Sequence, residues 1–164
     1  MKQTFTFNAI PAALDEFKAL PEAALQSPFQ TVALTLLALC RYRDDRDAAL
    51  AMLDFLKGPE AVSPYEKQFL RDRLEGKEYK PFSFFAGAAV ENDYTPAVPL
   101  TVTVEDNPYS YPDDKYATLY VRSAGADSER PVKLRKKPST GEWFLNEIQC
   151  LSDIRTPKSA DPWA

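Results

Sequence analysis

The sequence of 164 residues contains no histidine, two cysteines and five glycines. The absence of histidine excludes Ser-His-Asp and Cys-His nucleophile systems and metal sites ligated by histidine. Two cysteines are too few for a zinc site of four thiolates. Glycine is too scarce for most phosphate-binding loops, and neither G-x-G-x-x-G nor G-x-x-x-x-G-K-S/T occurs. We therefore expect no metal and no cofactor, and the residues do not by themselves name a function.

The rest of the composition is typical of a globular protein. Hydrophobic residues make up 45% and charged residues 27% of the chain, and a chain of this length usually forms one domain. The net charge of −4 gives no general attraction to nucleic acid or to anionic membranes. The start MKQTFTFNAI lacks the apolar segment of a signal peptide. We expect one cytoplasmic domain over residues 1–164, two free thiols and no membrane partner.

The first half of the sequence has helical patterns. Two segments, SPFQ at 27–30 and SPYE at 63–66, place Ser at the N-cap, Pro at the first helical position and Gln or Glu at the third, which predicts a capping box. The helix at about 28–42 is apolar on nearly every side and should be buried. In the fourth helix, Tyr65 and Phe69 are expected on the buried face together with Leu70 and Leu74. The four predicted helices begin at Pro11, at Pro28, after a cap at Asp44 or Asp45, and after Ser63.

The second half changes to the period of strands. After an aromatic and proline-rich connector at 77–99, alternating segments predict four strands joined by short turns, hence an antiparallel meander. These strands lie at 100–104, 116–122, 131–137 and 142 to about 150. The segment at 4–7 (TFTF) is predicted as a short strand or an arm. Helices followed by strands predict an α+β fold, with four helices on one face of a four-stranded sheet. A cone-shaped sheet, as in nuclear-transport-factor-like domains, would fit this element order.

Three segments carry a resemblance to a known family. They are PYSYPDDKYATLYVRSAGADSERPVKLRKKPSTGEWFLNE, SPYEKQFLRDR and the terminal DPWA. Together they resemble an uncharacterised bacterial domain family of unknown function. The resemblance implies a bacterial origin and a self-contained domain, and it implies no catalytic residue.

The polar face of the predicted sheet is the main candidate for a binding surface. In the strand at 131–137, Lys133, Arg135 and Lys137 alternate with apolar residues and therefore share one face. The strand before it adds Tyr120 and Arg122 to that face. The loop before that strand contributes tyrosines that suit a partner surface. The candidate binding residues are Tyr120, Arg122, Lys133, Arg135, Lys137, Tyr109 and Tyr111.

Several functional interpretations stay open. The plainest is a solvated sheet face with no ligand. The favoured one is a non-enzymatic binding module whose partner is an unknown protein or a small anionic ligand, since no catalytic constellation is visible. A hydrolase or isomerase using carboxylates and tyrosine would need a deep pocket with a buried Asp or Glu of raised pKa. An anion or RNA binder would use Lys133, Arg135 and Lys137, but the acidic net charge makes this the weakest hypothesis.

Overall fold

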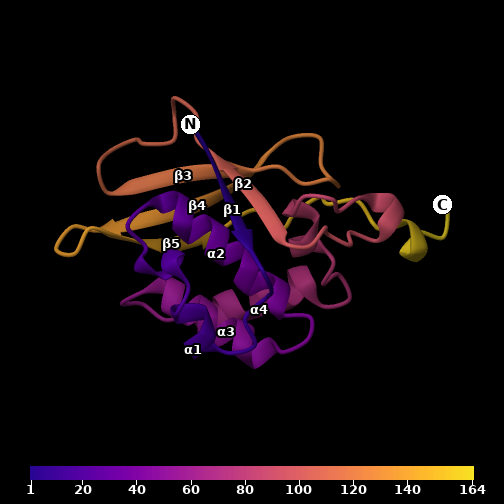
Figure 1. Cartoon of the computed structure of the whole chain (residues 1–164), viewed down its shortest axis with the longest axis horizontal. Coiled ribbons are helices and arrows are strands. Elements are labelled where there is room, and N and C mark those ends of the chain that lie inside the picture. Colours follow the sequence, from indigo (N-terminus) through magenta and orange to yellow (C-terminus); the bar gives the residue numbers. More distant parts are fainter.

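The computed structural model describes all 164 residues and shows helices beside an antiparallel sheet (Figure 1). The predicted α+β class is confirmed. The four α-helices are α1 (Leu14–Lys18), α2 (Pro28–Arg41), α3 (Arg46–Lys57) and α4 (Pro64–Leu74). The five strands are β1 (Lys2–Phe7), β2 (Leu100–Glu105), β3 (Tyr116–Val121), β4 (Arg130–Lys137) and β5 (Glu142–Ile148). Short 3-10 helices are η1 (Pro21–Ala24), η2 (Lys80–Phe84), η3 (Val90–Asn92) and η4 (Lys158–Ala160).

The sheet has five strands, so the prediction of four was wrong. The segment expected as a short strand or an arm is β1, which pairs antiparallel with β2 from Lys2 opposite Glu105 to Phe7 opposite Leu100. The whole helical half separates these two strands in the sequence, and no hairpin turn marks their pairing. The strand order is β1-β2-β3-β4-β5, which leaves β1 and β5 as the two edges.

Helix α2 is the centre of the fold. Twelve of its fourteen residues are buried, as its apolar sequence predicts, and it contacts all five strands. Helix α3 packs on α2 and on β5, whereas α1 packs on α3. The prediction that all four helices pack on one face of the sheet is thus corrected. Because α2 is apolar on all sides, its surface away from the sheet must also be buried by other helices.

The two predicted capping boxes have different outcomes. At α4, the Ser63 hydroxyl accepts from the N–H of Glu66, and the Glu66 carboxylate accepts from the N–H of Ser63, which confirms the motif. At α2, the Ser27 hydroxyl accepts from Phe29, the second helical residue. The Gln30 side chain accepts from the N–H of the residue before the cap instead of the cap itself. The capping box predicted at α2 is therefore wrong, although Ser27 does cap the helix.

The connector and the cysteines complete the interior. Both thiols, Cys40 and Cys150, are free and buried, as expected. The phenylalanines of the connector, Phe82, Phe84 and Phe85, are buried in the core. None of the helices is both long and apolar enough to span a membrane.

The edge strand β5 is attached to α2 by a buried hydrogen bond. The hydroxyl of Thr31 in α2 donates to the carbonyl of Trp143 at 2.6 Å. The N–H of Trp143 donates to the carbonyl of Leu25 at 2.8 Å. These bonds satisfy both backbone groups of Trp143 that point away from the sheet, and they fix β5 against the helical layer.

We predict that Thr31→Val destabilises the fold by about 1–3 kcal/mol, because it leaves a buried carbonyl without a donor. Thr35→Val is the matched control, since the hydroxyl of Thr35 is equally buried but donates to the carbonyl of Thr31 within the same helix. That carbonyl keeps its helical partner, so the control should cost less than about 1 kcal/mol. Urea unfolding measures both, and an equal or larger loss in Thr35→Val would contradict the role given to Trp143.

Candidate functional site

Strand β5 carries a β-bulge in its second half. The register shifts between Lys133 and Leu134 of β4, whose partners in β5 are Glu147 and Leu145. The residue between these partners, Asn146, has no counterpart in β4. Bulges of this kind occur at sheet edges and beside functional sites, where they redirect the chain.

The outer edge of β5 is bonded to the helical layer at Trp143, and Leu145, the next residue that faces this edge, is only 3% exposed. Both outward backbone groups of Trp143 are bonded to the helical layer. Phe144 lies opposite Arg135, and its backbone groups point toward β4. Because backbone groups alternate in direction along an antiparallel strand, the N–H and C=O of Leu145 point outward again. This part of the edge lies beside a groove.

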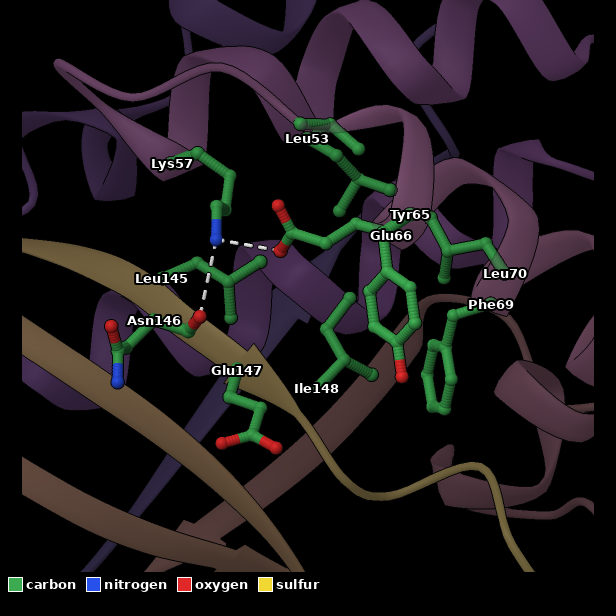
Figure 2. A pocket seen from close by; sticks show the side chains of 11 residues that line it. Leu53, Lys57, Tyr65, Glu66, Phe69, Leu70, Leu145, Asn146, Glu147 and Ile148 are labelled. Atoms are coloured by element: carbon green, nitrogen blue, oxygen red, sulfur yellow. Dashed lines mark hydrogen bonds and ion pairs between the residues drawn. The ribbon is translucent and has the colours of Figure 1, made fainter.

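An apolar groove separates this edge from α3 and α4 (Figure 2). Its volume is about 120 Å³, enough for one large apolar side chain. The rings of Tyr65 and Phe69, one turn apart on α4, lie together on one side, and Ile148 lies opposite them (Figure 2). The apolar lining consists of Leu53, Val62, Tyr65, Phe69, Leu70, Leu145 and Ile148.

The exposure of the α4 aromatic residues corrects the sequence prediction. Leu70 and Leu74 are buried as expected, but Tyr65 is 80% exposed and Phe69 is only partly covered. The guanidinium of Arg73 lies 5.0 Å from the centre of the Phe69 ring and supports it. Helical spacing places these aromatics beside the leucines but does not show that no other element covers them.

An ion pair lies across the upper part of the groove, between α3 and α4 (Figure 2). The Lys57 ammonium donates to the Glu66 carboxylate at 2.7 Å and to the backbone carbonyl of Asn146 at 3.1 Å. The Lys57 side chain is only 11% exposed. It therefore ties both helices to the bulge of β5.

The pKa of Glu66 lies below its ordinary value. Burial alone raises this pKa, but hydrogen bonds from Lys57 and Ser63 and the positive charge of Lys57 outweigh it. The carboxylate thus stays charged at neutral pH and is matched by Lys57. A group in this state does not hold a proton to donate, so it is unsuited to act as a general acid.

The end of α3 fits tightly against β5. Gly58 has φ +73°, which favours glycine, and an added Cβ would lie 2.5 Å from the Phe144 ring. The following turn is held by the Asp54 carboxylate, which accepts from the N–H of Val62 at 2.8 Å. This close approach places Lys57 at the boundary between the groove and a second hollow.

The second hollow has a volume of about 200 Å³ and is rich in cations. Besides Lys57, it is lined by Arg135, Lys136 and Lys137 of β4, and its one carboxylate belongs to Glu60. None of the three β4 cations takes part in an ion pair. Arg135 and Lys136 each lie 5.8 Å from an aromatic ring centre, that of Tyr116 and of Trp143 respectively. The groove and the hollow share Lys57, Leu145 and Asn146.

The residues predicted from the sequence are only partly brought together. Arg135 and Lys137 line the hollow, whereas Lys133 on the same strand does not. The charge of Arg122 is already balanced, because its guanidinium donates to the Glu105 carboxylate at 2.8 Å. Tyr120 pairs opposite that glutamate in the sheet.

The predicted tyrosines of the β2–β3 loop do not line the groove or the hollow. Tyr111 donates its hydroxyl to the Asp106 carboxylate at 3.3 Å, and Tyr109 is 87% exposed. Sequence reasoning missed the residues at the centre of the site, namely Lys57, Tyr65, Glu66, Phe69 and Asn146. Two of them, Tyr65 and Phe69, form the aromatic pair of the SPYEKQF segment, which helical spacing alone places in the core.

The structure does not supply the buried carboxylate that the hydrolase hypothesis requires. The buried polar residues are Thr31, Thr35, Lys80, Ser83, Ser110 and Ser123. The two carboxyl groups with shifted pKa values, Glu66 and Asp93, both shift downward, the latter through hydrogen bonds from Ser159. No group of three potential metal ligands is present.

Comparison with known families gives one match. The model of a family described as a domain of unknown function (DUF6935) matches residues 9–158. The chain belongs to this family. The match includes all four α-helices, the four strands β2 to β5 and every residue of the groove and the hollow. No curated protein and no solved structure matches the chain.

For this DUF6935 domain, the lowered pKa of Glu66 predicts how stability depends on pH. The folded protein binds this proton less readily than the unfolded chain, so the stabilisation is present above pH 4.5 and is lost as the pH falls through the lower folded pKa. Because about a third of the Glu66 side chain is exposed, solvent screens the pair. We expect Glu66→Gln to cost about 0.5–1 kcal/mol at pH 7.

Urea unfolding of Glu66→Gln between pH 3 and 7 measures this effect. The difference in the free energy of unfolding between this variant and the unsubstituted domain should shrink toward low pH. Glu91→Gln is the control, since that side chain is exposed and in no ion pair. A loss in Glu66→Gln that is independent of pH would contradict the assignment.

Proposed function

We propose that this DUF6935 domain is a non-enzymatic interaction module that binds a partner polypeptide by taking one of its apolar side chains into the groove between α3, α4 and β5. The observation that carries this proposal is an apolar groove at the edge of the sheet, with the Tyr65 ring 80% exposed at its rim. Exposed tyrosine next to an apolar recess is typical of the centre of protein interfaces.

The dimensions of the groove favour a polypeptide over a free small molecule. Sites for drug-sized ligands usually have volumes of about 300–1,000 Å³, whereas the groove has about 120 Å³. A single apolar side chain fits this volume.

The polar groups at the site favour binding over catalysis. Lys57 and Glu66 bind each other at 2.7 Å, so their opposite charges are already paired within the protein. The Asn146 carbonyl is also occupied, by the Lys57 ammonium. The exposed Glu147 carboxylate at the rim accepts from the Gln149 amide at 3.0 Å, and most of the remaining lining is apolar.

A matched pair of tyrosine variants tests the proposal. Random twelve-residue peptides displayed on phage are selected against the immobilised domain, and the enriched peptides are synthesised for fluorescence polarisation. We expect each enriched peptide to contain a large apolar residue. Tyr65→Ala should weaken binding about tenfold, as loss of an interface aromatic usually does. Tyr109→Ala, which removes an equally exposed tyrosine from the β2–β3 loop, should leave binding unchanged.

Both tyrosines are exposed, so neither substitution should lower the melting temperature, and unfolding curves control for the fold. The proposal is wrong if no peptide is enriched. It is also wrong if Tyr109→Ala weakens binding while Tyr65→Ala does not.

A further inference from the structure

We infer that β1 is the association surface for a second copy of this chain, and that two copies pair their β1 strands antiparallel across a two-fold axis at Thr4. The two sheets then form one continuous sheet. Strand β1 and the groove lie at opposite edges of the sheet, so this surface is separate from the proposed peptide site. Strand β1 also lies outside residues 9–158 of the family match, so the surface belongs to this chain and is not assigned to the whole family.

The outer edge of β1 carries free hydrogen-bonding groups. The N–H of Asp106 donates to the carbonyl of Met1 at 3.1 Å, which fixes the phase of the pairing between β1 and β2. Because backbone groups alternate in direction along an antiparallel strand, those of Lys2, Thr4 and Thr6 point away from β2. No other element bonds to these groups, and the three side chains are exposed. The strand therefore presents an unpaired row of donors and acceptors.

The two edges of the sheet differ in how they are protected. On β5, the helical layer bonds to Trp143, and Leu145 is buried. On β1, the one charged residue is Lys2 at the first position, and its ammonium already lies 3.8 Å from the Glu105 carboxylate of the same chain. Proline and bulges, which commonly protect an edge strand, are absent from β1. Such an edge favours the addition of another strand.

The pattern of β1 is complementary to itself. In an antiparallel pair centred on Thr4, this residue lies opposite its own copy, and Lys2 lies opposite Thr6 of the second copy. No like charges then face each other, and every outward backbone group of these three residues gains a partner. On the other face of the sheet, the half-buried Phe5 rings of the two copies become diagonal neighbours, within reach of each other. The chain thus contains the strand that fits its own open edge.

Pairing through β1 ends at a dimer. It uses the open edge of both copies, and the outer edges of the joined sheet are then the β5 strands, which the helical layers protect. A two-fold contact of this kind is closed and does not extend into a fibre. Because β1 has only six residues, the contact is smaller than a standard interface. We therefore expect a dimer that dissociates on dilution.

A matched pair of lysine variants tests the surface by sedimentation equilibrium of the full chain. From about 1 to 200 μM, the average mass should rise from that of one chain toward that of two. Thr4→Lys places like charges opposite each other at the axis and should weaken association about tenfold. Thr103→Lys is the control, because it removes the other hydroxyl of the Thr4–Thr103 hydrogen bond and adds the same charge one strand further in. It should change association less than about threefold.

Hydrogen exchange of single amides tests the pairing in the unsubstituted chain. In the dilute protein, the amides of Thr4 and Thr6 should exchange quickly, whereas those of Gln3 and Phe5 are protected by their bonds to β2. In the concentrated protein, Thr4 and Thr6 should become about tenfold better protected, and Gln3 and Phe5 should change little. This measurement needs no variant, so it decides the outcome even if a lysine substitution disturbs the fold.

Several results would overturn the second copy as the occupant of this edge. They are a chain that stays monomeric over the whole range, equal weakening by Thr4→Lys and Thr103→Lys, and self-association that leaves the Thr4 and Thr6 amides unprotected. Protection of these amides only when a selected peptide is added would also overturn it, since the edge would then bind a foreign strand. Failure to select any peptide would overturn the proposed function and leave the β1 contact intact.

Discussion

The structure depends on the burial of α2 from every side. A helix with twelve of fourteen residues buried needs a sheet on one side and further helices on the others. The five strands bury one side of α2. Helix α3, with α1 packed on it, helps to bury the other sides. Because burial of apolar surface is the dominant favourable contribution to folding, the positions of the sheet and of α3 both follow from the demands of this helix.

The candidate site lies where the sheet and the helices around α2 meet. Helix α3 contacts both α2 and β5, so its C-terminal end reaches the edge of the sheet. There, Lys57 bonds to the bulge at Asn146 and to Glu66 of α4, while Trp143 is fixed to α2. The contacts that hold β5 in place leave Leu145 between them. The groove beside this strand is apolar because α3 and α4 turn part of their apolar faces toward it.

Local patterns predicted much of the fold and little of the site. The period of α2, the cap at Ser63 and the alternation of Lys133, Arg135 and Lys137 depend on neighbouring residues, so the sequence contains them directly. The pairing of β1 with β2 spans the helical half and has no local signal. Lys57 and Glu66 are nine residues apart, on two helices joined by a turn. Whether they meet depends on the angle between these helices. Whether Tyr65 is covered depends on elements elsewhere in the chain.

The most direct test of the account is a map of the binding surface by NMR. Amide shifts of the ¹⁵N-labelled domain are recorded while a selected peptide is added. If the groove is the binding surface, the largest shifts fall on Leu145 to Ile148 and on Tyr65 to Leu70, which line it. Shifts confined to the β2–β3 loop or to the polar face of β1 and β2 would contradict this, because the functional surface would then lie away from the groove.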